Sequence, residues 1–322
     1  MAKIFINSKN PESRSRCNRW ASHDFPTNFW ANEIVGCQTA EKLATGGTNL
    51  FVPKDGDCVA CAGTVLTNDG EMEADALKRI YNNFNREEPL SVRDFLFGHY
   101  ILFVWINSEG FIFCDPIASY YCFYRIEDSE SVEISNLLSE FLDENVSDVD
   151  TIRLIRGAFE GHAGYGGHTF LPNVNRLTGN KFIYLKENNG NIAASVVPGK
   201  TRSDEHSSGS LEEFNATAEK VFRALGSVKS VGINATGGLD SRLIIAWAFS
   251  KGLNSQFIYG VGNSCMTNTR SEDLEVAKLL SKHYDRPLQV MDWRGGVGSS
   301  ESRKRNFERY GFAVPNRGVE GV

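Results

Sequence analysis

The residues of this chain best suited to chemistry form a single hexapeptide, Thr236-Gly237-Gly238-Leu239-Asp240-Ser241. A β-like run over residues 229–234 precedes it, and a helix-like run over residues 240–249 follows it. Two adjacent glycines let a backbone approach a ligand closely. The first N–H groups of a helix have no intrahelical partner, and the helix dipole favours negative charge beside them. The spacing therefore predicts an anion-binding turn between a strand and a helix.

Side chains in the turn narrow the predicted anion to a phosphate. The hydroxyls of Thr236 and Ser241 can donate hydrogen bonds to phosphate oxygens. The Asp240 carboxylate would be repelled by bare phosphate, so it indicates a divalent cation between the two. The lysine of the Walker loop is absent, which excludes that class of phosphate loop. The simpler interpretation is a strand–turn–helix joint in which Asp240 is the helix N-cap.

The elements around the turn indicate a parallel sheet covered by helices. The sequence patterns predict strands at 229–234, 256–260 and 288–292, and helices at 211–225, 240–249 and 272–284. Ligands of such sheets bind beyond the carboxyl ends of the strands, where Thr236 is expected to lie. Residues 200–209 are polar and contain glycine and serine, so they are expected to form a linker.

The first half of the chain is rich in β-strand patterns. Strands are predicted at 57–66, 100–106, 111–115, 120–125, 132–135, 182–185 and 193–197, with hairpin turns at 107–110 and 188–190. Helices are predicted at 75–84, 91–96, 137–143 and 151–159. The first fifty residues show no clear periodicity, and no element is predicted there.

Composition limits the classes of function. A net charge of −6 argues against general nucleic-acid binding. No apolar run is long enough to cross a bilayer, and residues 1–8 lack the apolar core of a signal peptide, so a cytoplasmic location is expected. An odd number of cysteines, seven, argues against a disulfide framework. Cys58 and Cys61 form a CxxC with no second pair, which favours small buried thiols.

Other residues with reactive side chains have simpler interpretations. His162 and His168 lie in a glycine-rich loop, and no carboxylate or thiol stands near them, so an exposed turn is favoured over a metal site. Arg294 and the basic cluster 303–305 could contact phosphate or an acidic acceptor, but a solvated helix face is favoured. His99 lies among core-like aromatic residues and is expected to be structural.

The hexapeptide resembles the S-G-G-x-D-S pyrophosphate loop of the N-type ATP pyrophosphatases. It is most similar to the S-G-G-L-D-S version of the asparagine synthetase family, with Thr236 in place of the first serine. Other segments also resemble that family, namely 95–105, 115–124, 169–179 and 271–277. The resemblance covers most of residues 57–293.

The resemblance implies two domains and a linker. Residues 1–199 are expected to form an Ntn-hydrolase-like, glutaminase-like αββα sandwich. Residues 200–210 are expected to be the linker. Residues 211–322 are expected to form a partial parallel-sheet α/β ATP pyrophosphatase domain, of the adenine nucleotide α-hydrolase-like class.

The resemblance also implies a reaction, with ATP and Mg²⁺ as cofactors. A carboxylate attacks the α-phosphorus of ATP, pyrophosphate leaves, and an amine displaces AMP from the acyl-adenylate to give an amide. Residues 236–241 are expected to bind the pyrophosphate, Asp240 to bind the metal, and Tyr259 and Gly260 to border the adenine.

Two departures from the family alter these expectations. Ala2 stands where glutamine-using members have a nucleophilic cysteine, so nitrogen is expected from ammonia or a substrate amine rather than from glutamine. About eighty residues follow Ser241, and the family's second metal-binding Asp and acceptor-side residues find no match among them. The chain is therefore expected to be a truncated, split or degenerate member, and a second chain could supply the missing half.

Three functions remain open. The first is an ATP-dependent, amide-forming ligase that acts on a small carboxylic acid. The second is a truncated or decayed nucleotide-binding protein, or half of a split synthetase, without activity of its own. The third is a sulfur-transfer relative that adenylates an RNA base. The third ranks last because the net charge is negative and the cysteine pair lies in the other domain.

Overall fold

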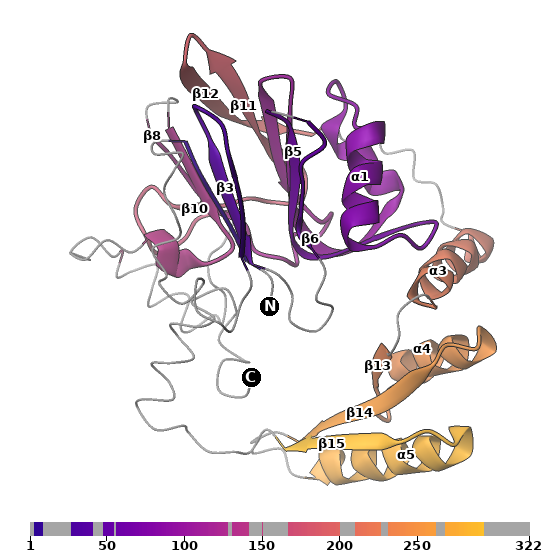
Figure 1. Cartoon of the computed structure of the whole chain (residues 1–322). Helices are drawn as coiled ribbons and strands as arrows, with labels where there is room; N and C mark the ends of the chain where they lie inside the picture. Colours follow the sequence, from indigo (N-terminus) through magenta and orange to yellow (C-terminus); the bar gives the residue numbers. More distant parts are fainter. Residues whose placement is uncertain are drawn as a thin grey trace. The chain divides into compact units, whose positions relative to one another are not determined.

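The computed structural model describes residues 3–8, 27–40, 48–54, 56–127, 131–141, 150, 167–199, 210–226, 231–261 and 268–292. These residues belong to two compact units. The N-terminal unit comprises the described residues of 3–67 and 71–199, and the C-terminal unit comprises 68–70 and the described residues of 210–292. The N-terminal unit holds two six-stranded antiparallel sheets, and the C-terminal unit holds a three-stranded parallel sheet (Figure 1).

The first sheet has the strand order β10-β8-β9-β1-β3-β2. Its strands are β1 Lys3–Asn7, β2 Thr27–Ala31, β3 Gly36–Ala40, β8 Phe123–Glu127, β9 Ser131–Ser135 and β10 Asn175–Arg176. Strands therefore occupy part of the first fifty residues, where the sequence predicted none. Every residue of β1 and β3 is buried, so neither strand shows the polar–apolar alternation that marks a half-exposed strand.

The second sheet has the strand order β12-β11-β7-β6-β5-β4. Its strands are β4 Leu50–Phe51, β5 Cys58–Thr67, β6 Leu96–Ile106, β7 Glu109–Cys114, β11 Lys181–Asn188 and β12 Asn191–Pro198. Both predicted hairpins are confirmed. The β6–β7 turn consists of Asn107 and Ser108, which have φ of 52° and 64°, as two-residue turns of this hand require.

The two sheets pack face to face and bury one shared core. Trp30 from the first sheet contacts the rings of Phe103 and Trp105 from the second. Helix α1, Glu73–Asn83, and the short 3₁₀ helix η1, Pro89–Asp94, cover the outer face of the second sheet (Figure 1). On the outer face of the first sheet, the described residues include one short 3₁₀ helix, η2, Leu138–Phe141.

The predicted short helices near residues 91–96 and 137–143 are thus 3₁₀ turns. The predicted helix at 151–159 and linker at 200–209 lie outside the described residues. Cysteines 37, 58, 61, 114 and 122 form no disulfide and are buried, which confirms the prediction of buried thiols for Cys58 and Cys61. Burial raises the pKa of Cys114 to about 12, so this thiol is a poor nucleophile. Cys17 and Cys265 lie outside the described residues.

The C-terminal unit alternates helices and parallel strands, as the sequence predicted. Its elements are α3 Leu211–Leu225, β13 Val231–Asn234, α4 Leu239–Ser250, β14 Ser255–Val261, α5 Asn268–Tyr284 and β15 Leu288–Asp292. The strands lie in the order β13-β14-β15, and both pairings are parallel. Helix α3 packs on α4, where Trp247 contacts the rings of Phe214 and Phe222. Among the helices that the structure describes, none is long and apolar enough to cross a bilayer.

Candidate functional site

The hexapeptide lies where β13 ends and α4 begins. The Ala235 N–H donates to the Ile258 carbonyl at 2.9 Å, so pairing with β14 continues until just before Thr236. Gly238 is the N-cap of α4, and it makes no side-chain cap hydrogen bond. Asp240 lies within the first turn of α4 and is therefore not the N-cap. The interpretation of Asp240 as a capping residue is wrong, and its exposed carboxylate is left for another role.

Two hydroxyl groups converge across the turn. The Thr236 Oγ1 and Ser241 Oγ atoms are 2.8 Å apart, which is hydrogen-bonding distance. The Gly238 N–H donates to Thr236 Oγ1 at 3.3 Å. These bonds bring the two hydroxyl-bearing residues of the hexapeptide to one place.

Backbone donors lie beside these hydroxyls. The first intrahelical bond of α4 runs from the Arg242 N–H to the Gly238 carbonyl at 3.2 Å. Among the described residues, the N–H groups of Leu239, Asp240 and Ser241 have no acceptor. They form the positive end of the α4 dipole, where an anion is stabilised. An anion placed there would meet backbone and hydroxyl donors together.

An acidic residue of α5 reaches the same loop. The Gly237 N–H donates to Asp273 Oδ1 at 3.0 Å. A Cβ atom at position 237 would lie 2.4 Å from that oxygen, so glycine is needed there for the approach of Asp273. The sequence patterns gave Asp273 no role, although it lies within the acidic run 271–277. In this structure the Gly237 N–H is occupied by protein and is not directed at a ligand.

Replacement of Asp273 by alanine is expected to expose the Gly237 amide. Loss of a hydrogen bond to a charged acceptor costs about 1.5–3 kcal/mol, which corresponds to at least a tenfold faster exchange of that amide. Amide hydrogen exchange measured by NMR checks this. Asp273→Asn keeps an acceptor oxygen and should restore most of the protection. Unchanged exchange in Asp273→Ala would show that the bond does not hold the loop.

The two residues expected beside the adenine lie at the same end of the sheet. Tyr259 and Gly260 extend β14 beyond the last residue of β13 and pair with Val290 and Met291 of β15. The Tyr259 side chain is buried in the core of the unit, while Gly260 is exposed. Any contact of Tyr259 with a ligand would therefore use its backbone.

The metal expectation depends on Asp240. Within the described residues, no group of three or more His, Cys, Asp or Glu side chains could hold a metal ion. One exposed carboxylate suits Mg²⁺ only where phosphate oxygens and water supply the remaining ligands. Asp240 fits this kind of site, because Mg²⁺ usually takes one or two carboxylates along with substrate phosphates.

The histidines considered as site residues lie on the surface where the structure describes them. The His168 Nδ1 atom lies 3.1 Å from Asn175 Oδ1 on the surface, as expected of an exposed turn. His99, which was expected to be structural, is exposed rather than in the core, and its Nδ1 atom lies 2.6 Å from Ser119 Oγ. Gly98, with φ of +117°, precedes His99 and is exposed as well. Ala2, His162, Arg294 and the cluster 303–305 lie outside the described residues.

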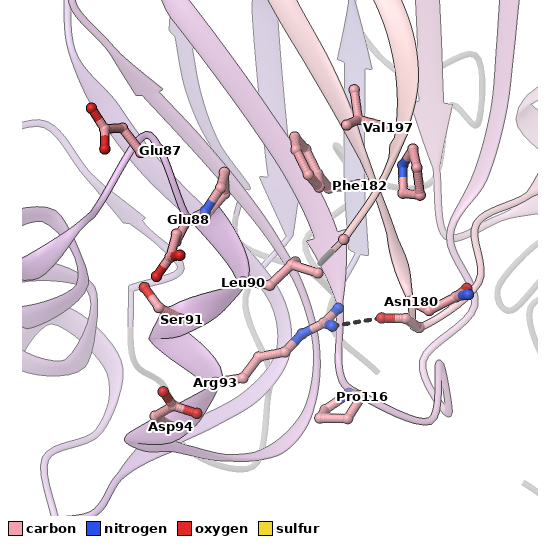
Figure 2. Close-up of a pocket in the computed structure, with 14 residues that line it drawn as sticks. Glu87, Glu88, Leu90, Ser91, Arg93, Asp94, Pro116, Asn180, Phe182 and Val197 are labelled. Carbon is pink, nitrogen blue, oxygen red and sulfur yellow. Dashed lines mark hydrogen bonds between the residues drawn. The ribbon is translucent and has the colours of Figure 1, made fainter. Parts of the chain in front are cut away.

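The N-terminal unit contains a cavity that no sequence pattern indicated. Its volume is about 850 Å³, and it lies between η1 and the neighbouring ends of β11 and β12 (Figure 2). Arg93 crosses its base, where the guanidinium donates to the carbonyls of Gly179 and Cys114 at 2.5 Å each. Burial lowers the pKa of Arg93 from its ordinary value. These bonds join segments 21 and 86 residues away from Arg93, so no local pattern could have revealed the cavity.

Comparisons with known proteins add little to this geometry. No protein-family model matches the chain, and no curated protein matches it. One similar solved structure is the glutamine phosphoribosylpyrophosphate (PRPP) amidotransferase from B. subtilis complexed with ADP and GMP. It has a TM-score of 0.39 and 8% identity, and the match covers 90% of this chain and 81% of that chain.

A second similar structure is described as the allosteric regulatory enzyme of purine biosynthesis. It has a TM-score of 0.39 and 10% identity, and the match covers 90% of this chain and 80% of that chain. Likeness at this level carries no conclusion about activity. The loop between β13 and α4, with its converging donors, is therefore the basis for a functional proposal.

Proposed function

We propose that the C-terminal unit binds ATP at residues 236–241 and that the chain is an asparagine synthetase-like, ATP-dependent ligase. It would adenylate a small carboxylic acid and form an amide with ammonia or a substrate amine. One observation carries the proposal: the Thr236 and Ser241 hydroxyls lie 2.8 Å apart at the N-terminus of α4. They do so within a hexapeptide that resembles a pyrophosphate loop.

Each group of the loop has a role in this reaction. A substrate carboxylate oxygen would form a bond to the α-phosphorus while the bond to the β-phosphate bridging oxygen breaks. The leaving pyrophosphate gains negative charge, which the N–H groups of Leu239, Asp240 and Ser241 and the two hydroxyls can stabilise. Asp240 would hold Mg²⁺, which neutralises phosphate charge when bound. An amine nitrogen would then attack the acyl carbon, and AMP would leave.

The N-terminal unit is part of the proposal. Its layers, two antiparallel sheets with α1 on the outer face of one, suit an Ntn-hydrolase-like domain. Ala2 carries no nucleophilic side chain. We infer that nitrogen arrives as ammonia or as an amine, that the protein works in the cytoplasm, and that a second chain supplies acceptor-side residues.

Exchange of labelled pyrophosphate into ATP tests the proposal. The purified full chain is incubated with ATP, Mg²⁺ and single carboxylic acids, with and without the product of the neighbouring gene. Exchange is expected only when the correct acid is present, because the reverse reaction starts from the acyl-adenylate. ATP binding is measured separately by calorimetry. Failure to bind ATP would overturn the assignment of the loop.

A second candidate function is nucleotide binding without chemistry. It is favoured by the Asp273 contact, because that carboxylate is bonded to the loop backbone in the described structure. Asp273 is thus engaged with the protein, and the hexapeptide itself contains a single carboxylate, Asp240, that could bind a metal. Tight ATP binding with no exchange for any acid, even with the neighbouring gene product added, would select this function over the ligase.

A further inference from the structure

The loop between β13 and α4 bonds several of its own donors to the protein. The Thr236 and Ser241 hydroxyls are 2.8 Å apart, so one of them donates to the other. The Gly238 N–H donates to Thr236 Oγ1 at 3.3 Å, and the Gly237 N–H donates to Asp273 Oδ1 at 3.0 Å. One hydroxyl proton and two amide protons of the loop are therefore directed at protein oxygens in the described structure.

Asp273 differs from the other acceptors because it carries a charge. The Thr236 and Ser241 oxygens belong to neutral hydroxyls, whereas Asp273 offers a carboxylate oxygen. A hydrogen bond to a carboxylate is stronger than one to a neutral oxygen, and a carboxylate repels a phosphate at close range. A phosphate oxygen bonded to the Gly237 N–H would lie about 3 Å from that nitrogen, as Asp273 Oδ1 does now. The two anionic oxygens would thus compete for one proton.

The contact is part of the packing of the loop against α5. A Cβ atom at position 237 would lie 2.4 Å from Asp273 Oδ1 and 3.7 Å from the Cβ atom of Val276, one turn further along the helix. Asp273 and Val276 are both half-buried. The Asp273 side chain is therefore held against the Gly237 backbone and does not extend freely into solvent.

We propose that Asp273 sets the affinity of the loop for phosphate by occupying the Gly237 amide when no nucleotide is bound. This inference rests on the proposed function, because it takes residues 236–241 as the phosphate site. The N–H groups of residues 239–241 remain available to a phosphate, but the Gly237 N–H becomes available only when its bond to Asp273 breaks. The apparent affinity is then reduced by the fraction of chains in which that bond is intact. Asp273 acts through Gly237 and is a positioning residue.

Calorimetric titration of the full chain with inorganic pyrophosphate, without metal and at about 0.15 M salt, tests this role. Asp273→Ala is expected to bind pyrophosphate at least about tenfold more tightly than the wild type, because the amide loses its charged partner. Asp273→Asn keeps an acceptor oxygen without the charge, so its affinity should lie between the two. A purely structural role predicts the opposite sign, since a damaged loop would bind more weakly. Equal or weaker binding by Asp273→Ala would overturn the proposal.

A neighbouring variant and a second ligand complete the test. Glu272→Gln removes the exposed carboxylate of the adjacent residue in α5 and should leave the affinity unchanged. Each chain is also titrated with ATP and Mg²⁺, and these affinities decide by the same rule where pyrophosphate binds too weakly to measure. If neither the wild type nor Asp273→Ala binds either ligand, the assignment of the loop fails, and this inference fails with it. Equal binding by both chains would leave the loop assignment standing and reject the role of Asp273 alone.

Discussion

Replacement of Asp240 with alanine is expected to reduce carboxylate-dependent exchange of pyrophosphate into ATP by about a hundredfold or more. The reason is geometric. Asp240 lies in the first turn of α4, exposed, and it is not the N-cap, so its carboxylate is not required to begin the helix. Its loss should therefore remove a ligand of the metal and leave the loop folded. The exchange rate, measured with saturating ATP and Mg²⁺, checks this.

Matched variants separate the metal role from a general charge effect. Asp240→Asn keeps the size of the side chain but loses the negative charge, so it should be nearly as inactive as Asp240→Ala. Glu275→Gln removes an acidic side chain of α5 that forms a surface ion pair with Lys278, and it should retain full exchange. Exchange at the wild-type rate in Asp240→Ala would show that the carboxylate does not hold the metal.

Replacement of Gly63 with alanine is expected to destabilise the N-terminal unit by about 3 kcal/mol or more. Gly63 lies in β5 with φ of +107°, and a Cβ atom there would be 2.1 Å from the His99 carbonyl oxygen of β6. Gly63 pairs with Tyr100 of β6, which lies between β5 and β7 in the second sheet, so the β6 backbone cannot easily yield. Urea-dependent hydrogen exchange of β5 and β6 peptides measures the change in this unit alone.

Gly190→Ala is the control for conformational strain without a clash. Gly190 has φ of +81°, and nothing lies within 4 Å of a Cβ atom at that position. Its replacement is expected to cost about 1 kcal/mol, because only the left-handed backbone conformation is penalised. Equal destabilisation by the two variants would show that the close approach of β5 and β6 does not constrain Gly63.

Local patterns predicted the C-terminal unit well. The strand before Thr236, the glycine turn and the helix after it are all set by residues adjacent in the chain, so their order and type were confirmed. Thr236 and Ser241 are five residues apart, and the turn between the end of β13 and the start of α4 brings their hydroxyls together. In the N-terminal unit, the hairpin at Asn107 was found for the same local reason.

Features formed by distant segments were not predictable. Strands β1 and β3 lie between other strands and are buried throughout, so they lack the alternation that sequence patterns detect. The Asp273 contact spans 36 residues, and the cavity at Arg93 joins η1 to Pro116 and to residues of β11 and β12. The aromatic neighbours of His99 did not indicate that its side chain is exposed. In each case, tertiary packing decided the outcome.

The hydrogen bond between Gly237 and Asp273 links the β13–α4 loop to helix α5. The loop belongs to the β13–α4 connection, whereas Asp273 belongs to α5, the helix that joins β14 to β15. In the proposed ATP complex, a phosphate oxygen would compete with this carboxylate oxygen for the loop amide. An entering nucleotide must either leave that oxygen in place or displace it. Displacement would break the hydrogen bond between the loop and Asp273, so occupancy of the loop would change a contact of a helix that need not touch the ligand.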